Sequence, residues 1–231
     1  MIEHEESIQP FQFYTHLHLT ELTGRKVHDL PELVEILKTA PGSVIYHHTH
    51  RFLKQHHYLS PEPPNDFAYW VTNVLQEEIL GEQLASIDII QFQTIRELRE
   101  KLLAVVEDHL KKSRNLRTAP VGDELNMMKT RTYVFPTYWT AHDLESFLEC
   151  LKNISINSIY FHMFEARLRI GKKSNDFSLW LENTLQETQL ARAIANLDPY
   201  TQTLEGLRRR ICFLVERRLH SKSEVMHVSA S

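Results

Sequence analysis

The chain has few glycines and few cysteines. Only 6 of its 231 residues are glycine, whereas average usage would give about 16. It contains neither a GxGxxG nor a GxxxxGK[ST] run, which disfavours nucleotide binding through a glycine-rich phosphate loop. The two cysteines, Cys150 and Cys212, lie in apolar helical patterns. This predicts packed, reduced thiols rather than a disulfide framework.

Long apolar runs and an excess of positive charge are also missing. No segment approaches the roughly 18 apolar residues of a membrane helix, and the opening MIEHEESIQP is acidic and polar. We therefore expect a cytoplasmic protein without a membrane partner. The net charge of -4 gives no reason to expect a nucleic acid as partner. Hydrophobic residues make up 42% of the chain, enough for an ordinary globular core.

Two stretches of the chain resemble each other. The run from Ser43 to Trp70 is echoed from Asn157 to Trp180. The matching residues lie 114 apart before a loop that is four residues shorter in the second copy, and 110 apart after it. We infer an internal duplication from the ordered matches Tyr46 with Tyr160, His48 with His162, Asn65 with Asn175, Phe67 with Phe177 and Trp70 with Trp180.

Hydrophobic periodicity predicts a mostly α fold with minor β structure. Each half reads as a short strand followed by helices, and the two halves form pseudo-equivalent helical units. We expect a first repeat unit at 1–112, a linker at 113–129, a second repeat unit at 130–220 and a flexible tail at 221–231. The linker is polar and contains Pro120 and Gly122.

The strand predictions rest on short patterns. Residues 11–19 alternate, with Phe11 and Phe13 on one face and His16 and His18 on the other. This alternation predicts that both histidines face solvent. Gly24 predicts a turn soon afterwards, and the apolar run 132–135 predicts a second strand that Pro136 closes.

Several polar residues stand where helices should begin. Asp29 precedes the apolar stripe of residues 30–37, and Thr94 with Glu97 has the spacing of a capping box. Asn65 or Asp66 is expected to cap a helix, as is the pair Asn175 and Asp176. Helix capping accounts fully for these polar pairs.

Several motifs together resemble an uncharacterised bacterial and archaeal family, a catalogued domain of unknown function. The motifs are YHHTHRFLKQHH, LSPEPPNDFAYWV, LASID, YFHMFEARLR, NDFSLWL and LDPYTQTLEGLRRRI. The resemblance covers about residues 8 to 220. It implies family membership and carries no activity, cofactor or catalytic residue.

A histidine-rich helix offers the first candidate site. His47 and His50 lie three residues apart, and His57 or a residue from another helix could complete a shell for a divalent metal such as Zn, Fe or Mn. The alternative is a set of partly buried, hydrogen-bonded or exposed imidazoles. Phe161 and Phe164 occupy the matching positions of the second half, which favours packed surroundings.

The second candidate site centres on the two histidines that both halves share. His48 and His162 lie on apolar stripes, where a buried imidazole needs a hydrogen-bond partner. They either line a shared polar pocket or are structural histidines bonded to backbone carbonyls. The candidate ligand-binding set is Tyr46, His48, Arg51, Tyr160, His162, Glu165 and Arg167.

Two functional hypotheses follow. The first is a non-catalytic binding or regulatory protein with a cleft lined by histidine and arginine, which takes a small anionic ligand or a protein partner. The second is a metal-dependent enzyme that uses the histidine cluster of the first repeat. No cofactor is certain from the sequence, and self-association into a homo-oligomer is left open.

Overall fold

The computed structural model describes residues 9–55, 65–113, 117–166, 168, 174–198 and 203–229. The described chain is mostly helical, with a two-stranded antiparallel sheet formed by β1 (Phe11–Val27) and β2 (Leu125–Ala141). It divides into two compact units. We call residues 17–133 the N unit, and residues 1–16 together with 134–231 the C unit. Each strand contributes one stretch to each unit.

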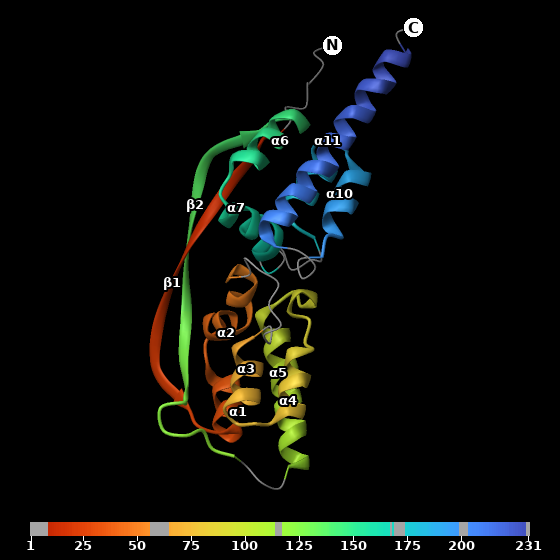
Figure 1. Cartoon of the computed structure of the whole chain (residues 1–231). Coiled ribbons are helices and arrows are strands. Elements are labelled where there is room, and N and C mark those ends of the chain that lie inside the picture. Colours follow the sequence, from red (N-terminus) through yellow and green to blue (C-terminus); the bar gives the residue numbers. More distant parts are fainter. Residues whose placement is uncertain are drawn as a thin grey trace, which may run out of the picture. The chain divides into compact units, whose positions relative to one another are not determined.

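The N unit packs its helices beside its stretch of the β1–β2 ribbon (Figure 1). Its helices are α1 (Leu30–Thr39), α2 (Gly42–Gln55), α3 (Asp66–Asn73), α4 (Glu78–Ala85), the short 3-10 helix η1 (Ile89–Gln91) and α5 (Ile95–Lys112). Their apolar stripes meet in one core, as amphipathic helices require. The buried side chains include Leu33, Ile45, Phe67, Trp70, Leu84 and Leu102.

The described helices of the C unit follow a similar order, with a π-helical turn where the N unit continues α2. Its helices are α6 (Leu144–Asn153), α7 (Ile156–Tyr160), a π-helical turn η2 (Phe161–Glu165), α9 (Asp176–Asn183), α10 (Thr188–Ala195) and α11 (Leu204–Ser229). Aromatic rings dominate its core. Phe13 stacks on Phe147 with ring centroids 5.8 Å apart, and Phe147 lies 5.4 Å from the ring of Trp180.

The predicted helix starts are confirmed. Asp29 accepts a hydrogen bond from the backbone of Glu32, and Thr94 forms a capping box with Glu97. Asn65 and Asn175, rather than the aspartates that follow them, accept from the first turns of α3 and α9. The side chains of Asp66 and Asp176 therefore do not cap these helices and can bond to other groups.

Both strands are longer than the sequence predicts. Gly24 lies inside β1 with φ +77 instead of ending it in a turn, so the expected turn is wrong. Pro136 lies inside β2. In a two-stranded ribbon each strand has an outer edge, where proline removes no ladder hydrogen bond. β2 begins at Leu125 within the segment predicted as a linker, because its residues pair with β1 far away in the sequence.

The predicted orientation of His16 is also wrong. The buried side of β1 changes from odd-numbered to even-numbered residues between Phe13 and His16. His16 is only 3% exposed, whereas Leu17 is 52% exposed. A 17-residue strand twists along its length, so a single alternating period cannot predict which face is buried.

The C-terminal segment is helical further than expected. α11 continues to Ser229, and residues 221–229 contain no glycine or proline that would end a helix. Among the helices that the structure describes, none is long and apolar enough to cross a membrane.

Candidate functional site

His48 links a helix to a strand in the N unit. Its Nδ1 lies 2.8 Å from Oδ2 of Asp66, and its Nε2 accepts a hydrogen bond of 3.0 Å from the backbone N–H of Met128. Because Nε2 accepts, the proton of a neutral ring is on Nδ1, which donates to the carboxylate. The ring is 3% exposed. His48 thus ties α2, α3 and β2 together.

His162 makes the same pattern in the C unit. Its Nδ1 lies 2.7 Å from Oδ2 of Asp176, and its Nε2 accepts a 2.8 Å hydrogen bond from the backbone N–H of Tyr14. Met128 and Tyr14 are 114 residues apart, the same offset that separates His48 from His162. In each unit the bonded strand therefore comes from the other half of the sequence.

In each unit a tryptophan forms a second bond, to a carbonyl two residues before the same strand. Trp70 Nε1 donates to the carbonyl of Asp123 at 2.9 Å, and Trp180 Nε1 donates to the carbonyl of Gln9 at 2.9 Å. Trp70 and Trp180 are 3% and 7% exposed. Both act as core anchors with a polar contact at the indole nitrogen, as expected for a buried tryptophan.

Two of the predicted ligand-binding residues are held by hydrogen bonds within the chain. His48 and His162 are buried histidines with partners on both ring nitrogens. Those partners are a carboxylate and a backbone N–H rather than the backbone carbonyl expected from the sequence. The carboxylate partners were missed because capping explained Asn65–Asp66 and Asn175–Asp176 completely. The signal that could reveal them is that both halves keep a histidine and an aspartate at matching positions.

The remaining histidines of α2 also contact hydroxyl groups. His47 Nδ1 lies 2.8 Å from Thr130 Oγ1, and His50 Nδ1 lies 2.8 Å from Thr49 Oγ1. The ring of Tyr46 stacks on that of His50 at 4.9 Å. His47 and His50 are 1% and 5% exposed. His57, Arg167 and the side chain of Arg51 lie outside the described part of the chain, so this structure leaves their predicted roles open.

A different pair of titratable residues meets in the C unit. His16 Nδ1 lies 3.6 Å from Glu165 Oε2, and the two side chains are 0% and 10% exposed. The π-helical turn η2 carries Glu165, and Tyr160 lies next to His16 with ring centroids 5.7 Å apart. π-helical turns are frequent at functional sites. His16 was missed because the alternation of β1 placed it in solvent.

Metal binding by His47, His50 and His57 stays a prediction, and β1 carries two further histidines. His16 and His18 are two residues apart on one face of β1. Glu165 lies next to His16. His16 and Glu165 are buried and His18 is half-buried.

A groove of about 640 Å³ lies in the C unit between the start of β1 and helix α9. Its walls combine aromatic rings with amides and the His162–Asp176 pair. The lining residues are Gln9, Pro10, Phe11, Gln12, Tyr14, Val134, Phe161, His162, Asp176, Leu179, Trp180, Asn183 and Thr184. This combination of apolar walls and a few polar groups is typical of ligand sites.

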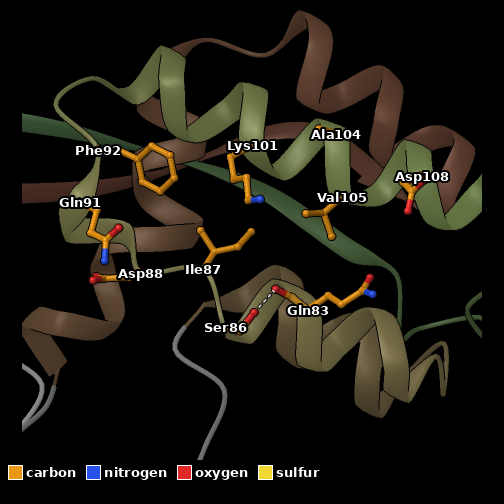
Figure 2. Close-up of a pocket in the computed structure, with 10 residues that line it drawn as sticks. All are labelled: Gln83, Ser86, Ile87, Asp88, Gln91, Phe92, Lys101, Ala104, Val105 and Asp108. Atoms are coloured by element: carbon orange, nitrogen blue, oxygen red, sulfur yellow. Dashed lines mark hydrogen bonds between the residues drawn. The ribbon is translucent and has the colours of Figure 1, made fainter.

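The N unit has a groove of about 590 Å³ between α4, η1 and α5. Figure 2 shows Lys101, Ile87 and Val105 pointing into the space between the helices, with Asp88 at one end and Asp108 at the other. The related groove between α10 and α11 carries Arg217 and Arg218. The two grooves therefore differ in the charged residues that line them.

Both cysteines are buried thiols, as predicted. Burial raises the pKa of the Cys150 thiol and that of the Cys212 thiol. A raised pKa lowers the fraction of thiolate, the nucleophilic form. Neither cysteine has the environment of a catalytic nucleophile.

The fold and these contacts define a class of mostly helical proteins in which buried histidines, each paired with an aspartate, fasten a long β ribbon to helices. Residues 8–216 match the model of DUF5752, a family of unknown function, and the chain belongs to this family. Among solved structures, the chain is similar to OrfY from Thermoproteus tenax, with 30% sequence identity and a TM-score of 0.78. The match covers 91% of this chain and 96% of that one. No curated protein matches the chain.

Proposed function

We propose that this chain is a non-catalytic binding protein whose C-unit groove receives an extended segment of a protein partner. The observation that carries the proposal is the position of the groove, which lies along a strand and beside a helix. Among the described residues, β1 pairs with β2 on one side only. A strand with an open edge is a template for adding another strand.

In the C unit, side chains bond to the backbone on either side of Gln12 along the chain. The N–H of Tyr14 is bonded to His162, and the carbonyl of Gln9 is bonded to Trp180. Alternate residues of a strand direct their N–H and C=O groups to the same edge. The backbone of Gln12 therefore faces the same side as the Tyr14 N–H, between the two side-chain bonds.

The lining indicates what the segment carries. Phe161, Leu179 and Trp180 offer an apolar surface, and Asn183 offers an amide. Asp176 is the charged residue among the described lining. The anionic ligand predicted from the sequence would meet this carboxylate. A partner segment with an apolar side chain and a neutral or basic neighbour fits better.

The duplication belongs to the same proposal. The two units are copies of one ancestral module that exchanged their strands. Three kinds of paired contact support this interpretation: histidine with aspartate, histidine with strand N–H, and tryptophan with the carbonyl two residues before the strand. The binding function then lies in the C unit, whose groove is lined by apolar rings.

The test uses equivalent positions of the two copies as target and control. A library of random dodecapeptides displayed on phage is selected on the full chain, and enriched peptides are titrated by fluorescence anisotropy. Asn183→Trp fills the groove, whereas Asn73→Trp changes the equivalent exposed position of the N unit. We expect at least a tenfold weaker binding in Asn183→Trp and no change in Asn73→Trp. Equal binding by both variants, or no enriched peptide, contradicts the proposal.

The second candidate is the metal-dependent enzyme. His47, His48 and His50 each use Nδ1 for a hydrogen bond within the chain, which does not favour the predicted cluster as a catalytic centre. The specific observation for this candidate is instead the contact between His16 and Glu165.

A further inference from the structure

The long helices α5 and α11 occupy equivalent positions in the N unit and the C unit. Arg99 of α5 donates to backbone carbonyls at the end of α1, and Arg208 of α11 donates to backbone carbonyls at the end of α6. Two further pairs of contacts agree with this register: Lys38 with Glu107 and Lys152 with Glu216, and Glu77 with His109 and Glu187 with Arg218. Each helix has therefore kept its contacts with its own unit.

The solvent-facing side of α11 differs from that of α5. Exposed residues of α11 recur every three or four positions and so share one face of the helix. They are Arg209, Arg210, Phe213 and Arg217, and the equivalent residues of α5 are Glu100, Lys101, Ala104 and Asp108. One lysine and two acidic residues in α5 thus correspond to three arginines in α11, and an alanine corresponds to a phenylalanine. We call these four residues of α11 the basic face.

The arginines of the basic face have no acidic partner within the described chain. The nearby carboxylates bind other cations: Glu205 pairs with Arg208, Glu216 with Lys152, and Glu187 with both Arg218 and Lys222. Arg210 lies over the ring of Phe213, with its guanidinium carbon 5.3 Å from the ring centroid. The positive charge of the basic face is therefore available to a ligand.

The basic face continues into the groove between α10 and α11, two helices that pack side by side in the C unit (Figure 1). This α10–α11 groove has a volume of about 380 Å³, and Arg217 is one of its lining residues. Its apolar lining comes from Leu190, Ala193 and Leu214. Phe213 is 49% exposed. Aromatic and arginine side chains are enriched in protein interfaces and supply much of their binding energy.

We propose that the basic face and the α10–α11 groove bind an acidic segment of a protein partner, with an apolar side chain beside its carboxylates. Guanidinium groups bind carboxylates through paired hydrogen bonds, and the groove receives the apolar side chain. The basic face extends about 12 Å along the helix axis, which accommodates only a few phosphates of a nucleic acid. The net charge of -4 also disfavours a long polyanion.

This surface is separate from the C-unit groove of the proposed function. The two grooves share no lining residue, and Asp176 gives the C-unit groove the opposite charge preference. Binding at one surface can therefore fail while binding at the other succeeds.

The experiment compares the full chain with a variant that carries the residues of α5 on the basic face. The variant combines Arg209→Glu, Phe213→Ala and Arg217→Asp, all at exposed positions. A library of random peptides displayed on phage is depleted on this variant and then selected on the wild-type chain. We expect the enriched peptides to be rich in aspartate and glutamate around an apolar residue.

Single substitutions then locate the binding of these peptides by fluorescence anisotropy. Arg217→Asp should weaken binding at least tenfold, and Arg217→Lys, which keeps the charge, should weaken it less. Arg96→Asp is the control, because it makes the same charge change at an exposed position of α5. It should leave the affinity unchanged, as should Asn183→Trp in the C-unit groove.

Three results would overturn the proposal. The first is that no peptide is enriched after depletion, or that the enriched peptides lack acidic residues. The second is an equal loss of binding in Arg96→Asp and Arg217→Asp. The third is that the wild-type chain, but not the triple variant, binds fluorescein-labelled oligothymidine or vesicles of phosphatidylserine and phosphatidylcholine, which would assign the basic face to a nucleic acid or a membrane surface.

Discussion

The tautomer of His48 follows from its neighbours. Since Nε2 accepts the Met128 N–H and Nδ1 faces Asp66, a proton on Nε2 would point at another N–H group. The neutral ring with its proton on Nδ1 is therefore the form that fits. The same reasoning applies to His162, between Tyr14 and Asp176.

Removing one of these rings should destabilise the fold strongly. We expect His48→Ala to lower the free energy of unfolding by about 2–4 kcal/mol, because it leaves the Met128 N–H without its acceptor and creates a cavity. His28→Ala removes an imidazole that is 45% exposed and paired with Glu32, and should cost at most about 0.5 kcal/mol. Urea unfolding followed by circular dichroism measures both. Equal effects in the two variants would show that the His48 contacts do not stabilise the fold.

Glu187 should make stability depend on pH. Burial raises the pKa of this carboxyl, and hydrogen bonds from Arg218 and Lys222 lower it by more, so the pKa lies below its ordinary value. A carboxyl with a lowered folded-state pKa stabilises the protein above its unfolded-state pKa of about 4.3. That stability is lost as the pH falls through the folded-state value.

Glu187→Gln tests this dependence. The variant should lose about 1–3 kcal/mol at pH 7, since the carboxylate is 6% exposed and holds two cations from α11. The difference from the wild type should shrink as the pH falls below about 4. Unfolding free energies measured from pH 3 to pH 7 give the curve. A difference that does not vary with pH would assign the effect to packing instead.

Helix α4 approaches α3 so closely at Gly81 that a larger residue there would require Thr72 to move. A Cβ added at Gly81 would lie 1.8 Å from Thr72 Oγ1 and 3.1 Å from Thr72 Cβ. Gly81 has no backbone strain that would require glycine, so the constraint comes from packing. At the equivalent position of the C unit, Ala191 is 2% exposed.

Gly81→Ala should therefore destabilise the chain by about 1–3 kcal/mol, although alanine is the better helix former. In the background of Thr72→Ala the cost should fall, because the Oγ1 contact is gone. Gly42→Ala is the control, since its Cβ would meet Ile95 Cγ2 at an ordinary 3.5 Å. A double-mutant cycle by thermal unfolding gives the coupling. No coupling between positions 72 and 81 would contradict the packing argument.

Local signals predicted the helices better than the strands. Capping residues such as Asp29, Thr94 and Asn175 act on groups within the same turn, so their spacing predicts helix starts correctly. The length of β2 and the burial of His16 depend on pairing and packing with distant residues. The contact between His16 and Glu165 joins residues 149 positions apart, and no local pattern contains that information.

At the scale of the whole chain, the strands decide which residues form a unit. The first half of the sequence carries His48 and Trp70, but their strand partners Met128 and Asp123 come after it. The second half carries His162 and Trp180, whose partners Tyr14 and Gln9 lie near the N-terminus. The repeat in the sequence and the compact unit in space therefore contain different residues.

This difference gives a prediction about fragments. A fragment of residues 17–133 contains the N unit as one continuous segment, with β2 residues to pair with β1 and to bond His48 and Trp70. We expect it to unfold cooperatively, because its buried polar groups keep their partners.

The fragment of residues 1–112 keeps α1 to α5 but lacks β2. It should unfold without a sharp transition, because an unpaired strand is not stable alone. In addition, His48 loses the N–H donor of Met128 and Trp70 loses the carbonyl acceptor of Asp123. Thermal circular dichroism and the dispersion of amide NMR signals compare the two fragments. Cooperative unfolding of 1–112 at the same temperature as 17–133 would mean that the strand contacts are dispensable and that the sequence repeat itself is the folding unit.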